Sequence, residues 1–260
     1  MADFTAPQPV SPATAAPGAA APGQPRRMSS AARILGAFYS PTATFEDLAR
    51  APHFILCWVV MIVANLLLAF SALHRIGRLG VASQLLLASP RVQALPADQI
   101  QKQITAMSSF LPLQLYALGP VGLIIIILVL AAIFLAAENF LLGQQAKYKG
   151  MLAAVSHAML PMALYSVAGA AVLWLKPDPA SSQFQNLLGS NAAFYFSPHS
   201  LSPVLNALLM HLDLFSFWVI GLLALGLVKL GQKVKYGSAL SVVVGLWILY
   251  VLIMVGVSAI

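Results

Sequence analysis

Glu138, Asn139 and His157 are the polar residues best placed to do chemistry, because they lie in or beside long apolar runs. Glu138 and Asn139 close one run, and His157 lies about seven residues into the next. Ionisable groups at such depth are costly and often form proton relays or substrate sites. A carboxylate and an imidazole at similar depth could relay a proton or coordinate a substrate. Equally, Glu138 could pair with Lys147 or Lys149 while His157 hydrogen-bonds a neighbouring helix.

Asp213 and Asn206 form a second candidate pair near the start of a later apolar run. They are seven positions apart and would share one face of a continuous helix. A carboxylate there could belong to a polar site, but Asp near a helix N-terminus is also favoured by the helix dipole. The sequence contains no standard catalytic or metal-binding motif. We therefore predict no enzymatic activity, no metal and no cofactor.

The elements that must position these residues are membrane-spanning helices. Hydrophobic residues make up 60% of the sequence and charged residues only 8%, which excludes an ordinary soluble domain. A segment of roughly 20 apolar residues crosses a hydrocarbon core of about 30 Å, and only a helix satisfies its backbone within the segment. The predicted fold is an all-α polytopic membrane protein with five transmembrane helices, at residues 54–73, 115–137, 151–175, 208–228 and 238–258.

One short segment occurs twice and predicts how the last four helices are arranged. Residues 142–148 read LGQQAKY and residues 230–236 read LGQKVKY, identical at five of seven positions. Each copy is a polar turn between two apolar runs, which predicts two repeated helical hairpins in parallel arrangement. The turn residues would then lie on one face of the membrane: Lys147, Tyr148, Lys149, Lys233, Lys235 and Tyr236.

The distribution of Lys and Arg predicts the orientation. Nine fall on the side of the N-terminus and five on the other side, which favours a cytoplasmic N-terminus and an outside C-terminus in the inner cell membrane. The net charge of +7 predicts contact with anionic lipid head groups. The cations are too dispersed for nucleic-acid binding.

Three regions follow from these patterns. Residues 1–28 are predicted to be a disordered, Ala/Pro-rich cytoplasmic tail. Residues 29–52 are predicted to form short amphipathic helices at the membrane interface, with Arg33 at the edge of an apolar stripe and available at the surface. Residues 53–260 are the predicted transmembrane domain.

Three short motifs resemble the Yip family, the Ypt/Rab-interacting multispan membrane proteins, in a bacterial form. They are Ile34-Leu35 followed by Pro41 and Phe45, Ser156-His157 with Pro161, and Asp213-x-Phe215-x-x-Trp218. The resemblance covers roughly residues 33–255 and implies a cytoplasmic N-terminus, five helices and no enzymatic activity. Eukaryotic relatives are associated with small GTPases and vesicle traffic, but the tail of this chain has no recognisable GTPase-binding motif.

Two functions are compatible with the sequence. The first is a non-enzymatic membrane protein that organises lipids or protein partners, including a second copy of itself, through Arg33 and the two turns. The alternative is a small permease or channel whose path runs between the two hairpins past Glu138 and His157. The low density of polar groups at membrane depth favours the first.

Overall fold

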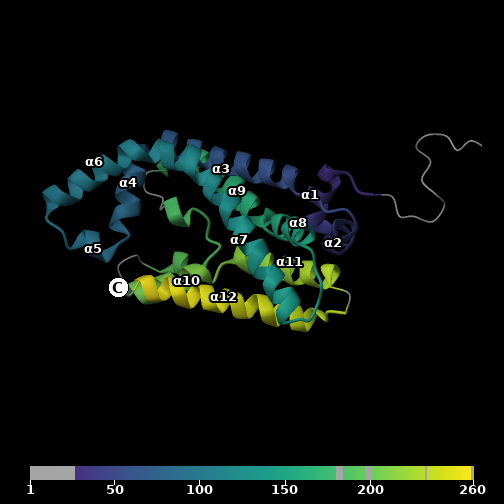
Figure 1. Cartoon of the computed structure of the whole chain (residues 1–260). Coiled ribbons are helices and arrows are strands. Elements are labelled where there is room, and N and C mark those ends of the chain that lie inside the picture. Colours follow the sequence, from purple (N-terminus) through teal and green to yellow (C-terminus); the bar gives the residue numbers. More distant parts are fainter. Residues whose placement is uncertain (1–26, 180–183, 197–200, 232, 259–260) are drawn as a thin grey trace, which may run out of the picture.

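The structure is a computed structural model that describes residues 27–179, 184–196, 201–231 and 233–258. Within these residues the secondary structure is helical, apart from an isolated bridge between Asn191 and Asp213. The predicted all-α class is therefore confirmed. Figure 1 shows an elongated bundle whose long helices lie alongside one another. The predicted tail lies almost wholly outside the described residues and stays a prediction.

Two short helices, α1 (Ser30–Tyr39) and α2 (Pro41–Arg50), precede the bundle. Ser29 caps α1 by accepting a hydrogen bond from the amide of Ala32 at 3.2 Å. Pro41 begins α2, where its missing N–H costs nothing. The apolar face of α2 buries Phe45 and Leu48 against the bundle. The predicted pair of amphipathic helices exists, and it is packed onto the membrane-spanning part.

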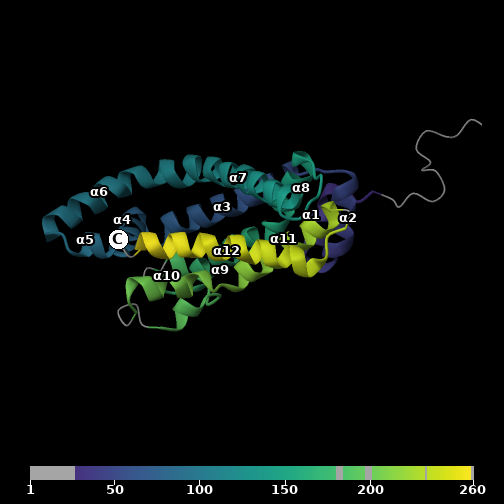
Figure 2. The same ribbon diagram turned by 60° about the horizontal axis from the view of Figure 1, so that its bottom comes forward.

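In the part of the chain that the structure describes, four helices are long and apolar enough to cross a membrane. They are α3 (Ile55–Arg75), the continuous helix Ala97–Phe140, the bipartite helix Tyr148–Leu175, and α12 (Tyr236–Ser258). The second comprises α6 (Ala97–Leu113), the π-helical turn η1 (Gln114–Leu118) and α7 (Gly119–Phe140). Its 44 residues greatly exceed the roughly 20 needed for a span, so it extends past the hydrocarbon core. Figure 2 shows its gentle curve.

The predicted span at 208–228 is divided in the structure. It falls on α10 (Pro203–His211) and α11 (Leu214–Leu230), separated by Leu212 and Asp213. Helix α11 has 17 residues, at the lower limit for a span, so the predicted count of five is not confirmed.

The segment between α3 and α6 contains α4 (Arg78–Leu87) and α5 (Pro90–Gln93). Val81 of α4 and Leu111 of α6 pack with Leu173 of α9 (Leu160–Leu175) in a second, smaller core. Two 3₁₀ turns, η3 (Phe184–Asn186) and η4 (Ala192–Tyr195), lie between α9 and α10. These elements gather at the opposite end of the bundle from α1 and α2 (Figure 1).

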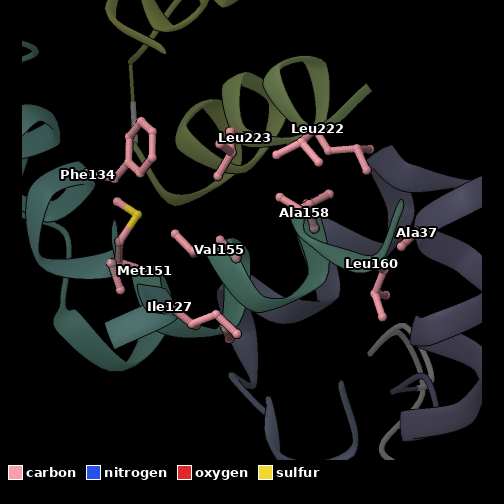
Figure 3. Packing of buried hydrophobic residues seen from close by; sticks show 14 of the residues in the cluster. Ala37, Ile127, Phe134, Met151, Val155, Ala158, Leu160, Leu222 and Leu223 are labelled. Atoms are coloured by element: carbon pink, nitrogen blue, oxygen red, sulfur yellow. The ribbon is translucent and has the colours of Figure 1, made fainter. Parts of the chain in front are cut away.

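Helix α8 (Tyr148–Ala158) is the centre of the main core. Every residue from 150 to 158 is buried. Figure 3 shows Met151 and Val155 of α8 between Leu223 of α11 and Ile127 of α7. Because α8 contacts α7, α11 and α2, it joins both hairpins to the N-terminal helices.

Candidate functional site

Each hairpin turn is followed by a tyrosine that begins the next helix. The Tyr148 hydroxyl donates to the carbonyl of Leu128 at 3.1 Å, and the Tyr236 hydroxyl donates to the carbonyl of Gly221 at 3.5 Å. Both acceptors lie on the preceding helix of the same hairpin. Each copy of the repeated sequence therefore begins a helix with a tyrosine that contacts the preceding helix, although the acceptor in the second copy lies 15 rather than 20 residues before the tyrosine. We call the place where α7 and α11 finish, and α8 and α12 begin, the turn end.

Asn139 holds the first turn in shape. Its side-chain oxygen accepts from the Ala146 amide at 2.8 Å, and its nitrogen donates to the Ala146 carbonyl at 3.4 Å. Gly143 has a φ of 64°, a conformation that favours glycine. Asn139 thus fixes the path of the backbone between α7 and α8.

The turn end presents a cluster of exposed side chains, as predicted. They are Lys147, Tyr148, Lys149, Lys233, Lys235 and Tyr236. None of the four lysines has an ion-pair partner among the residues that the structure describes. Four ammonium groups without a neutralising carboxylate give this end a local positive potential.

Glu138 lies directly beneath this cluster and is fully buried. A Cβ built on Gly231 would lie 2.6 Å from Glu138 Oε1, so the carboxyl group of the first hairpin packs against the turn of the second. Neither carboxyl oxygen has a hydrogen-bond partner in the described part of the chain. The predicted alternative that Glu138 pairs with Lys147 or Lys149 is therefore wrong. The turns fold so that both lysines point away from the packed interior.

A partly exposed ion pair fastens α2 to the turn end. Lys229 Nζ, in the last turn of α11, lies 2.7 Å from Glu46 Oε1. The hydrogen bond and positive charge of Lys229 lower the pKa of Glu46 below its usual 4.5. The carboxylate is therefore the favoured form at this contact.

His157 lies near the end of α8 and faces a different region from Glu138. The helix breaks at Met159. Pro161, in the first turn of α9 (Leu160–Leu175), has no N–H with which to continue the helical hydrogen bonds of α8. His157 Nδ1 lies 2.9 Å from the Ala153 carbonyl. The buried ring lines a cavity of about 340 Å³, together with Arg33. Glu138 does not line this cavity, and neither of its carboxyl oxygens has a hydrogen-bond partner in the described chain, so the suggested pairing of Glu138 with His157 is not found.

Arg33 is buried, whereas the sequence predicted it at the surface. Its Nε atom lies 2.6 Å from Asp47 Oδ2, and the two side chains are only 4% and 9% exposed. Because α1 packs against α2, α3 and α8, the guanidinium is enclosed between helices and requires a buried counter-charge. Asp47 supplies it from the buried face of α2. Two opposite charges on the apolar faces of adjacent short helices were the sequence signal for this pair.

Asp213 and Asn206 do not form a site together. Asp213 is the N-cap of α11 and accepts from the amides of Phe215 at 2.9 Å and Ser216 at 3.1 Å. It also accepts a hydrogen bond from the Ser190 hydroxyl. Asn206 lies on α10, so the predicted shared helical face is wrong. The helix-start interpretation of Asp213 is confirmed.

Trp58 and Ser156 make a contact that sequence reasoning missed. Trp58 Nε1 donates to Ser156 Oγ at 3.0 Å and joins α3 to α8 beside the cavity. Partners 98 positions apart leave no local pattern. The only signal was the presence of a serine next to His157.

The fold and the turn end together define a class. The chain is a polytopic helical membrane protein with two repeated hairpins, a cationic turn end and, in the part described, no cluster of residues suited to hold a metal ion.

A comparison with protein families identifies the family within this class. The Yip1 domain model matches residues 35–258, so the chain belongs to the Yip family of membrane proteins. The resemblance carried by the three short motifs is thereby confirmed. Comparisons with curated proteins and with solved structures each gave no match.

Proposed function

We propose that this protein is a non-enzymatic organiser of membrane surfaces, and that its turn end binds anionic lipid head groups or an acidic protein partner. The observation that carries the proposal is the group of exposed lysines in two adjacent turns. A juxtamembrane cation near an anionic surface contributes about 1 kcal/mol. Four of them could therefore contribute up to about 4 kcal/mol, less the effect of salt screening.

The proposed orientation places the turn end, α1 and α2 on the cytoplasmic side. The two turns lie at the same end of the bundle as α1 and α2 (Figures 1 and 2). The Lys and Arg distribution favours the same orientation. Anionic lipids of the cytoplasmic leaflet are then the nearest source of negative charge.

The geometry around Glu138 supports an organiser better than a permease. A solute path between the hairpins would require polar groups lining a common cavity. Glu138 is enclosed by protein against Gly231, and His157 opens onto a separate cavity near α1. The residues suggested for a path thus face different surroundings.

Vesicle capture tests the proposal. The full chain is reconstituted in nanodiscs of phosphatidylcholine, and capture of vesicles containing phosphatidylglycerol is measured. Replacing Lys147, Lys149, Lys233 and Lys235 by Gln should weaken capture at least about tenfold. A control variant replaces Arg78 and Lys102, two exposed cations at the opposite end, and should capture vesicles like the wild type. Equal capture by the quadruple variant would refute the lipid-binding role of the turn end.

A further inference from the structure

The cavity between α1, the start of α3 and α8 contains hydrogen-bond donors that no protein group uses. Arg33 lines this cavity, and its Nε atom is occupied by Asp47. Arginine carries five N–H donors, of which four belong to the two Nη atoms. These four have no acceptor among the described residues, and the Nη atoms are open to the cavity although the side chain as a whole is only 4% exposed. A largely buried guanidinium whose outer donors face an open cavity is placed to bind a ligand oxygen there.

The start of α3 adds a second set of donors on the same cavity. Phe54 is the N-cap residue and provides no side-chain cap bond within the described structure. Phe54, Ile55, Leu56 and Cys57 line the cavity. The first amides of a helix have no intrahelical partner and carry a partial positive charge. This combination of helix amides and a cation is suited to phosphate oxygens.

His157 provides an acceptor or donor on the facing wall. With Nδ1 directed at the Ala153 carbonyl, Nε2 has no protein partner in the described chain. The buried ring faces the cavity together with Ser30. A ligand with hydroxyl groups beside its phosphate would satisfy these atoms.

The outer wall of the cavity is apolar and continues along the surface of α3. Ile55, Val59 and Val63 follow one another at four-residue spacing and are 57%, 49% and 59% exposed. Residues four apart lie on one helical face, so they form a stripe that leads from the cavity along the membrane-spanning helix. A ligand that fits both parts has an anionic polar end and a long apolar end.

We propose that this cavity binds the head group of an anionic phospholipid. Arg33 Nη and the first amides of α3 hold the phosphate oxygens, and His157 Nε2 contacts a head-group hydroxyl. The acyl chains lie along Ile55, Val59 and Val63. Asp47 keeps the guanidinium in place and leaves its outer edge free. The inference rests on the proposed contact of this end with anionic lipid, but it uses residues that are separate from the hairpin turns.

Native mass spectrometry of the full chain, titrated with phosphatidylglycerol in detergent, tests the inference. Val59→Trp should fill the cavity and weaken binding of the first lipid at least about tenfold, the loss expected for hydrogen bonds to a charged group. Val129→Trp places the same side chain at a similarly exposed position of α7, away from the cavity and from the stripe on α3, and is the matched control. The double variant Arg33→Gln/Asp47→Asn removes the donors without leaving an unpaired buried charge, and it should lose binding as Val59→Trp does.

The outcomes separate this site from the turn end. Loss in Val59→Trp and in the double variant, with retention in Val129→Trp and in the quadruple Lys→Gln variant, supports the cavity whatever vesicle capture shows. Wild-type affinity in both cavity variants overturns it. Displacement of the lipid by millimolar inorganic phosphate, with phosphate retained at the same stoichiometry, would assign the site to a free anion and also overturn it.

Discussion

Replacing Glu138 by Leu should stabilise the protein, although Glu138 is among the most deeply buried residues. Its two carboxyl oxygens have no partner in the described structure, and a buried polar group without one costs about 1–3 kcal/mol. A leucine side chain has a similar volume and keeps the contact with Gly231, but it carries no polar group whose burial destabilises the fold. Because 1 kcal/mol changes the melting temperature of a chain of this size by roughly 2–4 °C, the expected rise is roughly 2–12 °C.

The assay is thermal unfolding of the detergent-solubilised full chain, followed by the fluorescence of its tryptophans. Glu138→Gln is the control because it keeps the size and polarity of the side chain, and it should melt closer to the wild type than Glu138→Leu does. A lower melting temperature for Glu138→Leu would refute the reasoning, since it would mean that the carboxyl group has a stabilising partner.

Three further predictions concern contacts of the turn end and the cavity wall. Gly231→Ala should lower stability by about 1–3 kcal/mol, because its Cβ would lie 2.5 Å from Val234 Cγ2 and 2.6 Å from Glu138 Oε1; equal melting of the two proteins would contradict this close packing. The Glu46 carboxylate, whose pKa Lys229 lowers, stabilises the folded state above pH 4.5 and loses this effect as the pH falls further. In chemical unfolding, the free energies of unfolding of the wild type and Glu46→Gln should differ by under about 1 kcal/mol at pH 7 and become equal below pH 4.5. A difference that does not change with pH would argue against the ion pair of Glu46 with Lys229. Ser156→Ala should cost about 1 kcal/mol in thermal unfolding by leaving Trp58 Nε1 without its acceptor, and Ser71→Ala, which removes the same contact from Trp174, is the matched comparison.

The repeat and the helical class were predictable because they depend on local patterns. Two copies of one turn sequence place Tyr148 and Tyr236 at the same position, and both residues begin a helix in the structure. Asp213 was recognisable as a helix start for the same reason. The division of the predicted span at 208–228 into two helices was not predictable from hydropathy. An apolar run shows no break in hydropathy where Asp213 begins a new helix.

The surroundings of the polar residues were harder to predict, because they depend on packing between distant segments. Glu138 meets Gly231 of the other hairpin, and Arg33 meets Asp47 of the next helix. Charge and hydropathy predict that such groups avoid lipid, but they do not identify the neighbour. The sequence therefore predicted Glu138 at membrane depth, but the partners it suggested, His157 or a lysine of the turn, are not the Gly231 neighbour that the structure shows.

Photo-crosslinking from the turn end tests the central proposal most directly. A photoreactive phenylalanine analogue replaces Tyr148 or Tyr236 in the full chain, reconstituted in phosphatidylcholine containing a minor fraction of phosphatidylglycerol. The exposed Tyr195, at the opposite end, is the control position. We expect phosphatidylglycerol among the lipids captured at Tyr148 and Tyr236 to exceed its bulk fraction, and to match that fraction at Tyr195. Capture in bulk proportion at all three positions would contradict a turn end that gathers anionic lipid.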